Sequence, residues 1–388
     1  MNKVLIGLLV GFLPFLVSCS QDSCGTDDPI AEEDAVLLDS LFATPTTAEL
    51  SQVQAEFSQS DLAANDVELL WQDTFSTENS QVNLIWIISH ASDGYRHYGA
   101  VIFPTSLDDS LPILLYAHWG DDGVSLDDFS TIMSLASGLE GRFVHVIPSF
   151  RSETLEYGDS SWTSEGTPSP WFGDVLDGLR LVSAAESLAV QNGDPKIGSI
   201  RRVIGFSRGG GVALLSALRD SRYDRIVDYF GPTDFFGDYV RNVVDSLLAG
   251  NNLDLPGLTT LDSSIVQPLL EGTLSLDSAR LELLRRSPAR FASQLPPLQI
   301  HHGTADQTVD ISQSDSLWKF LERDNPEIYA QSHYFVYEGA GHSPVGMLDS
   351  IDQTVDFLLD EQTTTARKLV KTNQDLIFLK PFAPRNSD

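Results

Sequence analysis

The stretch Gly205-Phe206-Ser207-Arg208-Gly209 constrains this chain more than any other feature. It matches G-x-S-x-G and lies between a β-branched run (202–204) and two glycines followed by an apolar helical segment (210–218). A serine held in a sharp turn needs neighbours without bulk two positions before and after it. The pattern therefore predicts a strand, a turn and a helix that present Ser207 as a nucleophile. The backbone N–H of Arg208, at the start of the helix, is the predicted first oxyanion donor.

A serine nucleophile needs a base and a group that orients the base. After such a turn, the acid and then the histidine follow the serine along the chain. Residues 298–303 are typical of a strand, and Asp306 lies in the loop that follows them. Residues 333–337 are typical of the next strand, and His342 lies in its exit loop. We therefore predict that His342 is the base and Asp306 its partner.

Three other side chains compete for these roles. Asp310 lies four residues after Asp306 in the same loop and is the alternative acid. His118 and His302 are weaker alternatives to His342, because both precede the acid that should precede the base.

The rest of the chain alternates between strand and helix patterns. Apolar runs predict strands at 67–71, 82–89, 98–103, 113–117, 143–147 and 225–230, and amphipathic spacing predicts helices at 126–139, 174–188, 312–321 and 351–359. This alternation indicates an α/β fold with a mostly parallel central sheet and helices on both faces.

Four segments, in the same order, resemble a known family. Residues 300–306 resemble its HGTxD acid loop, 339–342 its histidine loop, 287–298 the approach to the acid strand, and 87–101 its opening hairpin. Residues from about 82 to 359 thus resemble the catalytic domain of the prolyl oligopeptidase-like (peptidase S9) hydrolases and related esterases. The resemblance implies the α/β-hydrolase fold. It also implies a serine hydrolase that cleaves an ester or peptide bond through an acyl-enzyme.

The chain departs from this family in the turn after the strand 113–117. Residues 117–121 read Ala-His-Trp-Gly-Asp where the family usually has a His-Gly-Gly type turn. A backbone N–H near Trp119 is the predicted second oxyanion donor. Small acyl esters, including acetyl esters, remain alternative substrates to peptides. A non-catalytic binding lipoprotein that retains the fold is a further alternative.

Residues 231–286 form a long helical insertion, which we interpret as a cap or lid over the substrate pocket. The alternative is a second helical subdomain without a role in binding. Three aromatic side chains in or near this region are candidate substrate contacts, although they could equally pack under the cap: Trp162, Trp171 and Phe235.

The N-terminal sequence predicts export. Residues 1–18 hold one early positive charge and an apolar run of signal-peptide length. Leu16-Val17-Ser18-Cys19 matches a bacterial lipobox, which predicts a lipid on Cys19 and anchorage at the periplasmic or cell-surface face of a membrane. An ordinary secretory signal is the alternative. We further predict an acidic tether (19–50), the hydrolase domain (51–361) and a C-terminal tail (362–388).

Composition excludes several other classes of protein. The net charge of −31 argues against nucleic-acid binding, because the phosphate backbone is itself anionic. The chain has only two cysteines, Cys19 and Cys24, and its histidines lack helical ligand spacing. We therefore predict neither a metal site nor a cofactor, and the sequence gives no indication of an oligomeric state.

Overall fold

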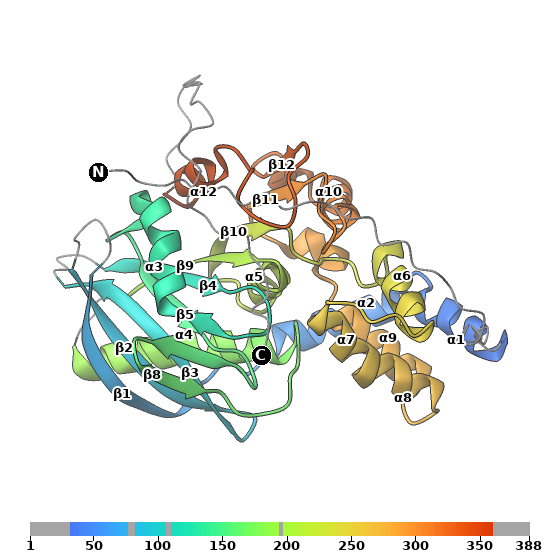
Figure 1. Ribbon diagram of the computed structural model, residues 1–388, viewed down its shortest axis with the longest axis horizontal. Helices are drawn as coiled ribbons and strands as arrows, with labels where there is room; N and C mark the ends of the chain where they lie inside the picture. Colours follow the sequence, from blue (N-terminus) through green and yellow to red (C-terminus); the bar gives the residue numbers. More distant parts are fainter. Residues whose placement is uncertain (1–31, 77–81, 106–109, 194–196, 360–388) are drawn as a thin grey trace, which may run out of the picture.

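The computed structural model describes residues 32–76, 82–105, 110–193 and 197–359 (Figure 1). The predicted signal peptide (1–18), the lipidation site Cys19 and the predicted tail (362–388) lie outside the described residues. No helix within the described ranges is long and apolar enough to cross a membrane.

A nine-stranded sheet forms the centre of the molecule, in the order β1-β2-β3-β6-β4-β9-β10-β11-β12. These strands are β1 (Asn65–Ser76), β2 (Val82–Ser92), β3 (Tyr95–Pro104), β4 (Leu111–Ala117), β6 (Val144–Pro148), β9 (Ile197–Phe206), β10 (Tyr223–Tyr229), β11 (Leu298–Gly303) and β12 (His333–Tyr337). Neighbours from β1 to β6 pair antiparallel, and neighbours from β6 to β12 pair parallel. The predicted strands and the mostly parallel sheet are confirmed.

Helices cover both faces of this sheet, as predicted. Side chains alternate along each strand, so Ile113 and Leu115 of β4 enter one core while Leu114 and Tyr116 enter the other. The first core includes side chains from α4 (Gly173–Asn192), α5 (Arg208–Arg219) and α10 (Ser312–Asp324). The second includes side chains from α3 (Leu126–Leu135) and α12 (Ser350–Leu359). Strands buried on both faces read as continuous apolar runs, which is why these strands could be predicted.

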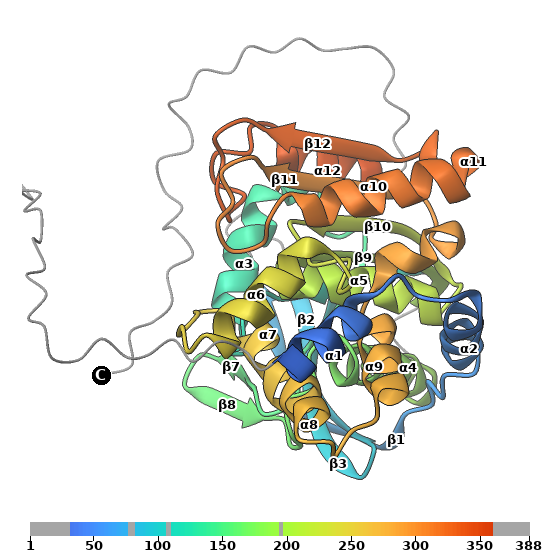
Figure 2. The same cartoon turned by 90° about the vertical axis from the view of Figure 1, so that its right-hand side faces the viewer.

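The N-terminal part of the described chain is helical, and the predicted tether (19–50) is wrong for this part. It forms α1 (Glu32–Phe42) and α2 (Thr47–Ser58), which lie beside α9 (Leu276–Arg285) (Figure 2). Leu38 and Leu41 of α1 are fully buried. Arg280 of α9 donates hydrogen bonds to the carbonyl oxygens of Ser40 and Leu41 and to the Glu49 carboxylate. Although this segment is acidic on its surface, it has a short apolar stripe that packs against the rest of the domain.

The insertion at 231–286 is helical, as predicted. It holds α6 (Asp238–Leu248), α7 (Pro256–Leu261), a π-helical turn (Asp262–Val266), α8 (Gln267–Leu270) and α9. The Tyr239 hydroxyl of α6 donates a hydrogen bond to the Thr308 carbonyl, so the insertion contacts the loop that carries Asp306. Its action as a lid stays a prediction.

A second, three-stranded sheet was not predicted. It consists of β5 (Val124–Ser125), β7 (Thr154–Tyr157) and β8 (Ser160–Thr163). Strands of only two to four residues carry too little periodicity to be recognised in the sequence. The remaining elements are α11 (Pro326–Tyr329) and 3₁₀ turns at Ser137–Leu139 and Pro288–Gln294.

Candidate active site

Ser207 occupies a strained turn between β9 and α5. Its φ of 54° and ψ of −122° lie in a region that residues other than glycine rarely adopt. The two glycines of the motif allow the chain to fold back this tightly. A Cβ at Gly205 would lie 2.0 Å from the Gly209 carbonyl oxygen, and one at Gly209 would lie 2.1 Å from the Ala117 carbonyl oxygen. This turn, which we call the elbow, therefore projects Ser207 at the carboxyl edge of the sheet, where the serine is half-buried. The helix that follows it, α5, is the elbow helix.

The structure brings Ser207, His342 and Asp306 together in one chain of hydrogen bonds. His342 Nε2 lies 2.8 Å from Ser207 Oγ, and His342 Nδ1 lies 2.7 Å from Asp306 Oδ2. These contacts join residues 135 and 36 positions apart in the sequence. With a proton on Nδ1 shared with the carboxylate, Nε2 is free to accept the hydroxyl proton.

The loop after β11 keeps Asp306 ionised. Its Oδ1 accepts hydrogen bonds from the backbone N–H groups of Thr308 (2.9 Å) and Val309 (3.0 Å). Burial raises the pKa of this carboxyl, but the hydrogen bonds from His302 and His342 and the charge of His342 outweigh it, so the pKa lies well below its usual range. An ionised Asp306 can hold the imidazole in one tautomer and stabilise its charged form.

The competing acid and bases lie elsewhere. Asp310 is exposed, and its Oδ1 accepts a hydrogen bond from the Ser312 backbone N–H at the start of α10. His302 is fully buried, with Nδ1 2.7 Å from Ser314 Oγ and Nε2 3.4 Å from Asp306 Oδ2, so it contacts the acid rather than the serine. His118 is also buried, and its Nδ1 lies 2.9 Å from the Trp119 carbonyl oxygen.

The two predicted oxyanion donors belong to segments that touch. Arg208 is the first residue of α5, and the first N–H groups of a helix have no acceptor inside the helix. The turn that holds Trp119 packs on the same helix end, since a Cβ at Gly209 would also lie 2.6 Å from the His118 carbonyl oxygen. The use of Arg208 and Trp119 as oxyanion donors stays a prediction.

Two of the three aromatic side chains predicted to contact substrate are in the core. Trp171 is 3% exposed and Phe235 is fully buried, and their rings lie 4.9 Å apart. The Trp171 indole N–H donates to the Arg208 carbonyl oxygen. These two predictions are wrong, because both rings are buried in the core, where Trp171 packs against α5 and Phe235 packs against Trp171. Trp162 is half-buried on β8, with its ring 6.3 Å from that of Trp71, and its role in binding stays a prediction.

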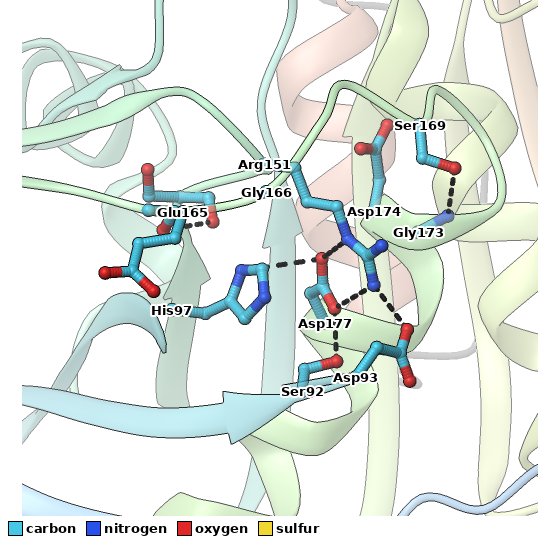
Figure 3. A network of polar contacts seen from close by, with 12 residues as sticks. Ser92, Asp93, His97, Arg151, Glu165, Gly166, Ser169, Gly173, Asp174 and Asp177 are labelled. Carbon is cyan, nitrogen blue, oxygen red and sulfur yellow. Dashed lines mark hydrogen bonds and ion pairs between the residues drawn. The ribbon is translucent and has the colours of Figure 1, made fainter. Parts of the chain in front are cut away.

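A network of charges fixes the loop after β6 at this edge of the sheet (Figure 3). Arg151 donates to Asp177 of α4 (2.7 Å) and to Asp93 (2.6 Å). Ser92 also donates to Asp177, and His97 Nδ1 lies 3.5 Å from it. This network holds the start of α4 against β2 and β3. Among the described residues, no group of three His, Cys, Asp or Glu side chains is placed to hold a metal ion.

Asp228, which sequence reasoning did not identify, lies on β10 beneath the elbow. It is fully buried, and its Oδ1 accepts a hydrogen bond from the Gly231 backbone N–H (3.0 Å). Its Oδ2 is buried and meets no hydrogen-bond partner among the described residues. Burial raises the pKa of Asp228 to about 7, although His302 and the Gly231 N–H act in the opposite direction.

Asp228→Asn is expected to stabilise the protein at pH 8 by about 4 kcal/mol and to change little at pH 4. Because the pKa is raised in the folded state, that state binds the extra proton between about pH 4 and 7, and wild-type stability falls as pH rises through this window. Urea unfolding at both pH values measures the effect. Asp224→Asn, at a partly exposed position of the same strand, serves as control. A gain that is equal at both pH values would contradict the prediction.

Comparison with known proteins identifies the fold. No protein-family model matches the sequence, and no curated protein matches it. The structure is similar to acetyl xylan esterase 1 from Thermoanaerobacterium sp. JW/SL YS485, with a TM-score of 0.54 and 16% identity over 84% of this chain and 98% of that one. It is also similar to acetyl xylan esterase from Paenibacillus sp. R4, with a TM-score of 0.50 and 14% identity over 83% of this chain and 98% of that one. The chain therefore has the α/β-hydrolase fold.

Proposed function

We propose that the protein is a serine hydrolase that cleaves an ester or peptide bond through an acyl-enzyme. The observation that carries this proposal is the chain of hydrogen bonds from Ser207 through His342 to Asp306, with the serine at a strained strand–helix turn. An arrangement of a nucleophile, a base and an orienting acid within hydrogen-bond reach is the signature of nucleophilic catalysis. A backbone held at φ 54° also indicates a constraint beyond simple packing.

In the proposed reaction, Ser207 Oγ attacks the substrate carbonyl while His342 Nε2 accepts its proton. The carbonyl oxygen becomes an oxyanion that the Arg208 N–H and an N–H near Trp119 stabilise. His342 then donates the proton to the leaving alcohol or amine, and the acyl group stays on Ser207. In the second half of the reaction, water attacks this ester while His342 Nε2 accepts its proton. His342 then donates that proton to Ser207 Oγ, and the carboxylic acid is released.

Small acyl esters are the second, narrower candidate substrate. Two of the structures of similar fold are acetyl xylan esterases, and this favours an ester over a peptide. The peptidase-like motifs of the acid and histidine loops favour the wider class, in which the substrate is either an ester or a peptide.

One experiment tests the function and separates the candidates. We expect a fluorophosphonate probe to label the wild type at Ser207 and to leave Ser207→Ala unlabelled. Turnover of p-nitrophenyl acyl esters from acetate to longer chains, beside aminoacyl and dipeptidyl anilides, then assigns the substrate class. An unlabelled wild type that turns over none of these compounds would instead support the binding lipoprotein.

A further inference from the structure

The side chain of Arg208 is a buried cation directly after the proposed nucleophile. Arg208 is 7% exposed, and its guanidinium lies 4.9 Å from the centre of the Phe150 ring. A buried guanidinium is stable only when its donors find acceptors. Arg208 Nε donates to Asp174 Oδ2 (2.8 Å), and Nη1 donates to Glu153 Oε1 (2.5 Å) and to the Gly120 carbonyl oxygen (3.0 Å).

These acceptors come from three separate segments. Gly120 belongs to the turn after β4, Glu153 to the loop after β6, and Asp174 to the first turn of α4. One planar fork therefore joins three segments to the residue that follows Ser207. The backbone N–H of Arg208 and its side chain can act independently, because any substitution except proline keeps the N–H.

A second contact holds the same turn. His118 Nδ1 donates to the Trp119 carbonyl oxygen (2.9 Å), which leaves Nε2 without a proton in the neutral imidazole. Nε2 faces Glu153 Oε2 at 3.4 Å, and neither atom makes any other hydrogen bond among the described residues. Two buried acceptors this close need a proton between them. Burial lowers the pKa of His118 to about 4 and raises that of Glu153 to about 7, which favours the proton on Glu153.

The turn from 118 to 120 is thus held at two successive carbonyl groups. Arg208 donates directly to the Gly120 carbonyl oxygen. Glu153 contacts both Arg208 and His118, and His118 in turn donates to the Trp119 carbonyl oxygen. The turn also touches the elbow helix closely, because a Cβ at Gly209 would overlap the Ala117 and His118 carbonyl oxygens. A small displacement of the turn would therefore move any oxyanion donor that it carries.

We propose that the Arg208 side chain is a positioning residue that fixes the 118–120 turn as the second half of the oxyanion hole. This inference rests on the proposed function. The Arg208 charge itself is compensated by the Asp174 carboxylate, and Glu153 accepts a hydrogen bond from it, so its role is geometric rather than a direct attraction for the oxyanion. The effect should appear in the transition state, where the oxyanion exists, and not in ground-state binding.

We test this with Arg208→Met, using the p-nitrophenyl ester that the wild type hydrolyses best. We expect kcat to fall about 100-fold while KM stays within about twofold, since a misplacement of about 1 Å can have an effect of this size. The affinity for a trifluoromethyl ketone, which forms a tetrahedral adduct on the serine, should fall by the same factor as kcat/KM. Arg208→Lys should lose about tenfold in kcat, because an ammonium keeps the charge but not the fork.

Two comparisons separate positioning from stability. Arg219→Met removes another buried arginine of α5, at its far end about 16 Å away, and should leave kcat within about twofold. Glu153→Leu should lower kcat as Arg208→Met does, whereas Glu153→Gln should recover most of it. The glutamine can accept from Arg208 through its oxygen and donate to His118 Nε2 through its amide group. Kinetics are measured below the unfolding temperature of the least stable variant.

The outcomes are distinguishable. A wild type that neither reacts with the fluorophosphonate nor hydrolyses any ester overturns the proposed function and this inference with it. If the wild type is active, two results overturn the positioning role alone. One is an Arg208→Met variant that loses no more kcat than Arg219→Met, and the other is an Arg208→Met variant whose KM rises while its kcat is unchanged. If Arg208→Met does not fold, equal kcat for Arg208→Lys, Glu153→Leu and the wild type overturns it.

Discussion

His342→Ala is expected to lower kcat by about 10⁶-fold, the largest effect of any single substitution other than at Ser207 itself. Without the imidazole, Ser207 Oγ has no base at 2.8 Å to accept its proton, and the leaving group has no acid. The other candidate bases cannot replace it, because His118 and His302 are buried and bonded elsewhere. Steady-state hydrolysis of the best ester measures the loss, and the rate of fluorophosphonate labelling should fall with it.

A matched histidine and a double substitution make this result specific. His333→Ala removes an exposed histidine that begins the edge strand β12, and should leave kcat within about twofold. Ser207→Ala/His342→Ala should be no slower than Ser207→Ala alone, because groups that act as one unit are strongly non-additive. Additive losses, or a His342→Ala enzyme that keeps most of its activity, would show that the imidazole is not the base.

Local chemistry made the elbow and the central strands predictable. Gly205 and Gly209 flank the serine because a Cβ at either position would overlap backbone atoms, and the structure reproduces this requirement. The strand β4 is a continuous apolar run since both its faces are buried. The order of Asp306 and His342 along the chain follows from the order of the strands that precede them. In each case the cause lies within a few residues of the pattern.

Contacts between segments far apart in the sequence could not be predicted, because they leave no local sequence pattern. Arg208 meets Glu153 and Asp174 across 55 and 34 residues, and nothing around those carboxylates predicts a buried cation. Trp171 could not be assigned to the core because its loop is polar, and the apolar ring finds its place only against α5 and Phe235. The tether was predicted from acidic composition, yet the burial of Leu38 and Leu41 decided the structure of α1.

Asp306→Asn is expected to lower kcat by about 10⁴-fold with little change in KM. The asparagine oxygen can still accept from the Thr308 and Val309 N–H groups, so the loop should keep its conformation. Its amide nitrogen would then face His342 Nδ1, at the position where Oδ2 now accepts a proton. The imidazole would have to carry its proton on Nε2 instead, which points at Ser207 and could no longer accept. Steady-state kinetics measure the loss, and thermal unfolding confirms that the variant is folded.

Asp310→Asn decides between the two carboxylates in this loop. Asp310 is exposed, and its carboxylate accepts a local hydrogen bond from the Ser312 N–H, which an asparagine oxygen can also accept. We therefore expect kcat within about twofold of the wild type. The reverse result, an inactive Asp310→Asn beside an active Asp306→Asn, would transfer the acid role to Asp310. That transfer would need the loop after β11 to move, because Asp306 Oδ2 already lies 2.7 Å from His342 Nδ1. The six residues between β11 and Asp310 form a turn that Asp306 itself organises, by accepting hydrogen bonds from the Thr308 and Val309 N–H groups.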